Sequence, residues 1–64
     1  MSKNIIILNT KHGYKVLNNG HFIGFRFNEN SAIALGAKVA KILGGAVIAE
    51  NGFYLSAKEV QALA

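Results

Sequence analysis

A single long segment with a helical repeat constrains this sequence more than any other feature, and it runs from Asn28 to Gly45. Asn28 or Asn30 can begin it as the N-cap, because an asparagine oxygen accepts a backbone N–H that has no partner in the first turn. The pair Gly44–Gly45 ends it, since glycine takes the left-handed C-terminal conformation without a steric penalty. We therefore predict one main helix, against which the shorter segments must pack.

Large apolar side chains recur along this helix at spacings of three and four, which predicts a continuous apolar face. They are Leu35, Val39, Ile42 and Leu43. The opposite face, with Ala34, Lys38 and Lys41, is predicted to be solvated.

A second stripe on the same helix consists of small residues spaced four apart: Ala32, Gly36 and Ala40. A glycine inside a helix costs about 0.5–1 kcal/mol relative to alanine, so close packing should offset it. The first explanation is close packing of the helix onto the sheet of its own chain. The second is close approach of the same helix in another copy, which makes these three residues candidates for an oligomer interface.

Two segments before the helix have the patterns of strands. Lys3 to Asn9 contains four consecutive apolar residues, which is typical of a strand covered on both faces, inside a sheet or at a subunit interface. Tyr14 to Phe27 is predicted to form a hairpin, because Asn19–Gly20 supplies the positive φ angles of a two-residue type I′ turn.

The predicted turn also sets the register of that hairpin, with Leu17 opposite Phe22 and Val16 opposite Ile23. Alternation then assigns one face to the helix, and that face carries Tyr14, Val16, Ile23, Phe25 and Phe27. The other face combines apolar and basic side chains. Its candidate partner-binding residues are Leu17, Phe22, Lys15, Arg26 and Lys11.

After the helix, residues 46–49 and 53–55 flank Asn51–Gly52, which predicts a second hairpin with the same turn type. Ser56 and Glu59 have the spacing of a capping box and begin a short C-terminal helix. The predicted fold is a small α+β domain of order β-β-β-α-β-β-α, an antiparallel sheet packed on one main helix. It forms a single domain over residues 1–64, without a linker.

The chain is more apolar than its size accounts for. Hydrophobic residues make up 52% of 64 residues, and the mean hydropathy is +0.30. A domain this small cannot bury such a share internally, and surplus apolar surface commonly marks a protein–protein interface. We therefore expect a homo-oligomer, with a cyclic dimer as the commonest form, and a larger protein as a further partner.

The sequence offers little for catalysis, cofactors or metals. It contains neither cysteine nor aspartate, and Glu29, Glu50 and Glu59 are explained by turns and helix starts. His12 and His21 share a face of the predicted hairpin, but they lie roughly 20 Å apart at about 3.3 Å per residue. No phosphate-loop pattern is present, and the helical segment is too short and too charged to span a membrane. We expect a non-enzymatic protein with no cofactor, located in the cytoplasm.

The net charge of +4 leaves two binding hypotheses. The favoured one is an interaction module of inhibitor or adaptor type, as accessory proteins of mobile elements often are, with an apolar surface and a basic rim. The alternative is a nucleic-acid binder whose sheet face contacts phosphates through Lys11, Lys15 and Arg26 while Phe22 stacks on a base. Three or four cations would give only weak, salt-sensitive binding, and this ranks the protein partner first.

Overall fold

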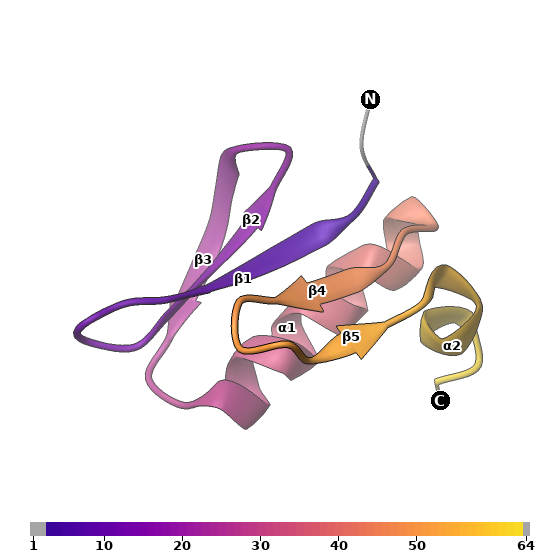
Figure 1. The fold of residues 1–64 in the computed structure, drawn as a ribbon. Coiled ribbons are helices and arrows are strands. Elements are labelled where there is room, and N and C mark those ends of the chain that lie inside the picture. The colour runs from indigo at the N-terminus through magenta and orange to yellow at the C-terminus, as the bar shows by residue number, and fades with distance from the viewer. Residues whose placement is uncertain (1–2, 64) are drawn as a thin grey trace.

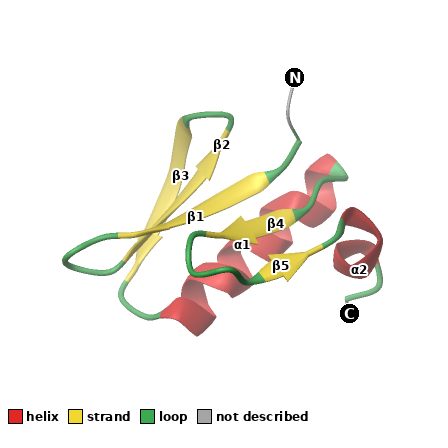
Figure 2. Cartoon of the chain, viewed as in Figure 1, coloured by secondary structure: helices red, strands yellow, loops and turns green. Residues whose placement is uncertain are grey.

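The computed structural model describes residues 3–63, which form a five-stranded sheet with two helices against it (Figure 1). Figure 2 distinguishes the strands, helices and loops. The order of elements confirms the predicted small α+β fold. The elements are β1 (Ile5–Asn9), β2 (Tyr14–Asn18), β3 (His21–Arg26), α1 (Glu29–Leu43), β4 (Val47–Ala49), β5 (Tyr54–Leu55) and α2 (Ala57–Gln61).

The sheet is mixed, so the prediction of a wholly antiparallel sheet is wrong at one pair of strands. The strand order is β3-β2-β1-β4-β5, and β1 and β4 are the parallel pair. The cause is α1, because a helical crossover connects strands that run in the same direction. Helix α1 carries the chain from β3 to β4. Strand β4 then pairs with β1 on the side opposite β2.

The first hairpin turn has the predicted conformation, with φ angles of 50° at Asn19 and 83° at Gly20. The second turn differs. Asn51 does not have a positive φ, whereas Gly52 has a φ of 101°, and the Ala49 N–H donates to the Phe53 carbonyl at 2.8 Å. Three residues therefore separate the paired positions, and the prediction of a two-residue type I′ turn is wrong here. A type I turn followed by a left-handed glycine is the usual three-residue alternative.

A β-bulge at Ile23 changes the faces of β3. The predicted pairing of Leu17 with Phe22 is confirmed, but Val16 then pairs with Gly24, which leaves Ile23 as an extra residue. Such a bulge reverses the face of every later residue in the strand. Phe25 therefore leaves the helix-facing side for which it was predicted.

Helix α1 begins and ends at the predicted residues. Asn28 has an extended conformation, and its side-chain oxygen accepts the Ser31 N–H at 2.8 Å. Gly44 is left-handed with φ 82°, and its N–H donates to the Ala40 carbonyl at 2.7 Å. Both ends thus satisfy backbone groups that a bare helix would leave without partners.

The face of α1 that packs on the sheet is the stripe of small residues, not the predicted apolar face. Ile42 is 78% exposed, and Leu35 and Val39 are only half-buried at the flank. A Cβ added to Gly36 would lie 3.2 Å from Ile5 Cγ2 and 3.4 Å from Ile7 Cδ1, so the helix backbone approaches β1 closely. Small side chains permit this approach, and it is the first of the two explanations for the stripe.

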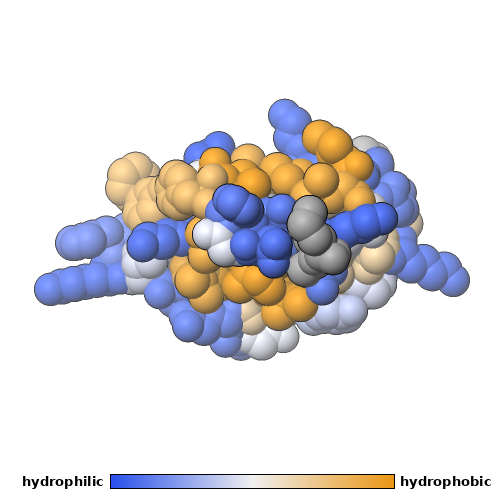
Figure 3. Space-filling view, turned by 90° about the horizontal axis from the view of Figure 1, so that it is seen from above, coloured by the Kyte–Doolittle hydropathy of each residue, from blue (hydrophilic) through white to orange (hydrophobic). Residues whose placement is uncertain are grey.

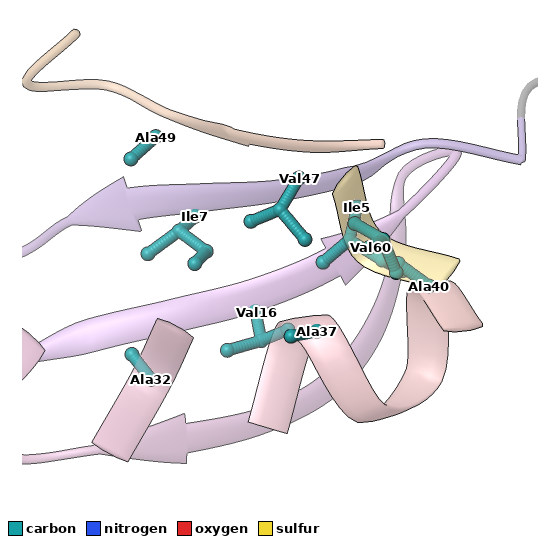
Figure 4. Packing of buried hydrophobic residues seen from close by; sticks show 9 residues of the cluster. All are labelled: Ile5, Ile7, Val16, Ala32, Ala37, Ala40, Val47, Ala49 and Val60. Carbon is teal, nitrogen blue, oxygen red and sulfur yellow. The ribbon is translucent and has the colours of Figure 1, made fainter. Parts of the chain in front are cut away.

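The core lies between α1 and the sheet (Figure 4). Its strand residues alternate with residues of the opposite face, and Val60 of α2 joins the same cluster beside Ile5 and Ala40. Both helices therefore lie on one side of the sheet. The cluster comprises Ile5, Ile7, Val16, Ala32, Ala37, Ala40, Val47, Ala49 and Val60.

Helix α2 has the predicted capping box. The Ser56 hydroxyl oxygen accepts the Glu59 N–H at 3.1 Å, and the Glu59 carboxylate accepts the Ser56 N–H at 3.0 Å. Hydrogen bonds from the Ser56 backbone and side chain lower the pKa of Glu59. The carboxylate therefore stabilises the fold above its unfolded pKa, and this contribution is lost as the pH falls through the lower folded pKa.

We expect Ser56→Ala to reduce the free energy of unfolding by about 1 kcal/mol, because the N-terminal amides of α2 lose their cap. Ser56→Ala keeps the backbone N–H that contributes most to the lowered pKa of Glu59, so the pH dependence is tested with Glu59→Gln, which removes the titrating carboxylate. Glu59→Gln should lose less stability than the wild type when the pH is lowered below about 4. Urea titrations at pH 7 and pH 3 measure both effects. Ser31→Ala, within α1, is the matched control and should change neither quantity by more than about 0.5 kcal/mol.

Candidate protein-interaction surface

The side of the sheet opposite the two helices carries a row of apolar side chains that crosses all five strands. The register pairs Phe22 with Leu17, Leu17 with Ile6, Ile6 with Ile48, and Ile48 with Tyr54. Residues directly opposite one another in a sheet point to the same side. We call this set, Phe22–Leu17–Ile6–Ile48–Tyr54, the cross-strand row, and the side of the sheet that carries it the open face.

Within residues 3–63 no helix covers the open face, because α1 and α2 both pack on the other side. The two aromatic ends of the row are well exposed, at 63% for Phe22 and 57% for Tyr54. The three aliphatic residues between them are half-buried, since they shield one another. Figure 3 shows that hydrophobic residues also form broad areas of the molecular surface. Antiparallel sheets with one solvated face normally alternate apolar and polar residues, and this sheet does not.

A second row crosses the open face two residues further along β1, at Leu8. It pairs Phe25 with Lys15 and Lys15 with Leu8. Glu50 continues the parallel ladder beyond β4, because its N–H donates to the Ile7 carbonyl at 2.9 Å, and this puts Glu50 level with Leu8. The second row therefore brings one basic and one acidic residue to opposite sides of β1.

Two aromatic rings, one in β3 and one just after its last residue, extend the apolar surface of the open face. The rings of Phe25 and Phe27 meet edge to face, with centroids 5.3 Å apart, and Phe27 is 82% exposed. A Cβ added to Gly13 would lie 2.5 Å from Phe25 Cζ, so this glycine makes room for the ring.

Arg26 does not lie on the open face, and its predicted grouping with Phe22 and Lys15 is wrong. The bulge at Ile23 reverses its side, so Arg26 pairs with Tyr14 on the helix side of the sheet. It lines a shallow hollow with Ser31, Ala34, Leu35 and Lys38.

Lys11 belongs to the loop between β1 and β2 and is exposed at the end of the sheet. The Thr10 hydroxyl closes this loop, because it donates to the Gly13 carbonyl at 2.9 Å and accepts the Gly13 N–H at 3.0 Å. Of the predicted basic residues, Lys15 is the one that the strand register places on the open face, and Lys11 lies in the loop at the end of the sheet.

The residues predicted for an oligomer interface on α1 are not accessible to another copy. Ala32 and Ala40 have no exposed surface, and Gly36 is buried against β1. The oligomer-interface prediction for these three residues is therefore corrected, and the stripe serves the packing of α1 on its own sheet.

The acidic residues are each engaged in local structure. Glu50 Oε1 accepts the Asn9 N–H at 3.0 Å, Glu29 bonds the Asn51 side chain, and Glu59 completes the capping box. Within the described part of the chain, no three His, Cys, Asp or Glu residues cluster closely enough to hold a metal ion. Neither helix there has the length and apolarity to cross a membrane.

Sequence reasoning found Leu17 and Phe22 but missed Ile6, Ile48 and Tyr54. The apolar run in β1 was the available signal for Ile6, because it left no polar face on that strand. Ile48 and Tyr54 could not be assigned, since their membership depends on the pairing of β4 with β1. Comparison with protein-family models, curated proteins and solved structures finds no significant match.

Proposed function

We propose that this protein is a non-enzymatic interaction module of inhibitor or adaptor type that acts as a homo-oligomer and binds protein through its open face. The cross-strand row carries this proposal. Exposed aromatic residues beside aliphatic ones, with charges at the edge, are the composition that protein interfaces favour. Lys15 and Lys11 supply a basic edge for a partner with acidic residues.

The absence of a catalytic role is part of the same proposal. Each of the three glutamates already accepts a local hydrogen bond, and they lie on different elements. Acid–base catalysis needs two titratable groups in one site with pKa values driven apart. We also propose a cytoplasmic location, since a chain without cysteine does not depend on disulfides for stability.

The test is a binding assay with immobilised wild-type protein and extract from the native host, followed by measurement of the recovered partner. Phe22→Ala should weaken that binding at least about tenfold, because exposed aromatic residues dominate interface energies. It should cost less than about 1 kcal/mol of stability, since the side chain is 63% exposed. Ile42→Ala is the matched control, since Ile42 is an apolar residue on α1 that is 78% exposed, and this variant should bind as the wild type does.

Equal binding by the Phe22 and Ile42 variants would contradict the proposal. The displacement of Arg26 leaves the nucleic-acid hypothesis with Lys15 on the same face as Phe22 and with Lys11 in the loop at the other end of the hairpin. Retardation of single-stranded or duplex DNA that Lys15→Glu abolishes would favour that alternative instead.

A further inference from the structure

We propose that the open face binds a second copy of this chain, related by a twofold axis parallel to β1, so that two sheets stack face to face. The inference rests on the proposed function, that the open face is a protein-binding surface, and assigns its occupant. A twofold interface requires a self-complementary patch. If one residue of the first copy contacts a given residue of the second copy, the same two residues also meet with the copies exchanged. The cross-strand row has this property.

The row is chemically symmetrical about β1. Its centre is Ile6, an aliphatic residue stands on either side at Leu17 and Ile48, and an aromatic residue ends it at Phe22 and Tyr54. Rotation about an axis along β1 exchanges the two halves of the row. Phe22 then meets the second copy's Tyr54, Leu17 meets its Ile48, and the two Ile6 side chains meet at the axis. Aromatic pairs of this kind add to the energy of burial.

The same rotation pairs the charges. Lys15 lies one strand to one side of β1 and Glu50 lies one strand to the other, both level with Leu8. The axis therefore brings Lys15 of each copy opposite Glu50 of the other, twice per dimer. Apolar and charged residues thus satisfy one symmetry operation. An axis along the row would instead put β2 over β2, and Lys15 would not meet Glu50.

The size of the face predicts the strength of association. The five strands contain between two and six residues each. At about 3.3 Å per residue and about 4.8 Å between strands, they present roughly 330 Å² of flat sheet per copy. Two such faces together lie below the roughly 1,200 Å² of a standard specific interface, in the range of weak and transient complexes. We therefore expect a concentration-dependent equilibrium between the 6.8 kDa chain and its dimer, with the sheets packed about 10 Å apart.

The decisive experiment mixes two charge-reversed variants, Lys15→Glu and Glu50→Lys, in sedimentation equilibrium. Each variant alone places like charges opposite one another, so its dimer dissociation constant should rise at least about tenfold. Mixed together, the variants form two opposite-charge pairs and should recover wild-type affinity. The double variant should do the same with itself. Glu50→Gln keeps an oxygen for the Asn9 N–H and controls for the lost hydrogen bond.

A second measurement does not depend on charge reversal. Ile6→Cys introduces the sole cysteine of the chain at the proposed axis, and a short bismaleimide should link two copies through it. Ile42→Cys, which is exposed on α1, should not cross-link at the same concentration. Circular dichroism establishes that each variant is folded.

The inference is overturned if the wild type stays monomeric at high micromolar concentration, if mixing fails to restore association, or if Ile6→Cys cross-links no better than Ile42→Cys. A monomer that still loses its foreign partner through Phe22→Ala would overturn the twofold dimer together with the homo-oligomer of the proposed function. It would still support the binding of another protein through the open face. A dimer that survives both charge reversals would place the interface elsewhere.

Discussion

Gly45→Ala is expected to remove most of the stability of the fold. The added Cβ would lie 1.9 Å from the Lys3 carbonyl oxygen, 2.3 Å from its carbonyl carbon and 3.0 Å from the Asn4 nitrogen. All three are backbone atoms, so no side-chain rotation can relieve the overlap. The start of β1 would have to move away from the residue that precedes β4.

That movement would break the contacts that bring the two halves of the chain together. The Ile5 N–H donates to the Ala46 carbonyl at 2.8 Å, and the Ala46 N–H donates to the Asn4 side chain at 3.0 Å. We expect a loss of more than about 3 kcal/mol, from overpacking combined with lost hydrogen bonds. A domain of this length has a total stability of about 3–10 kcal/mol, so most of it would disappear.

Urea denaturation followed by circular dichroism measures this effect, and Gly44→Ala is the control. Gly44 has a φ of 82°, but a Cβ there would meet nothing within 4 Å. The control should therefore lose only the left-handed strain of about 1–2 kcal/mol. Equal losses in the two variants would show that the close approach of Gly45 to Lys3 does not determine stability.

The features that the sequence predicts correctly are those decided by a few neighbouring residues. Asn28 and Gly44 as helix caps, Asn19–Gly20 as a type I′ turn and Ser56 with Glu59 as a capping box all depend on local hydrogen bonds and φ preferences. Such preferences act over three or four residues. They hold in the structure because tertiary packing does not oppose them.

The features that the sequence predicts wrongly depend on which segments meet. The bulge at Ile23 lets Gly24 face Leu35 of α1, and a Cβ at Gly24 would lie 2.9 Å from Leu35 Cδ2. Periodicity within β3 contains no sign of this constraint. In the same way, the spacing of Leu35, Val39 and Ile42 predicts an apolar face, but β1 accepts the smaller residues of α1 because they allow a closer approach.

The candidate site shows the same division between local and tertiary information. Leu17 and Phe22 are paired by their own hairpin turn and were predicted together. Arg26 was misplaced because the bulge lies between it and the turn. Ile48 and Tyr54 join the row only through the parallel pairing of β4 with β1. These two strands are far apart in the sequence, and the crossover through α1 brings them together.

Ile6→Lys and Ile7→Lys are expected to have opposite results, although the two residues are identical neighbours in β1. Ile7 has no exposed surface and faces α1, so a lysine there would bury an unpaired charge. We expect Ile7→Lys to lose more than about 4 kcal/mol and to unfold. Ile6 is half-buried on the open face, where the stem of a lysine can lie along the sheet while its ammonium group reaches water.

Ile6→Lys should therefore keep the fold, with a loss of about 1 kcal/mol in the free energy of unfolding. It should no longer bind a second copy or another protein through the open face. At the proposed twofold axis it brings two ammonium groups together, and the dimer dissociation constant should rise at least about 100-fold. Thermal denaturation and sedimentation equilibrium of the two variants measure fold and association separately. If Ile6→Lys unfolds as Ile7→Lys does, the open face supports the fold itself and is not a recognition surface. If it folds and still dimerises with wild-type affinity, association uses another surface, because no interface centred on Ile6 could accept two facing charges.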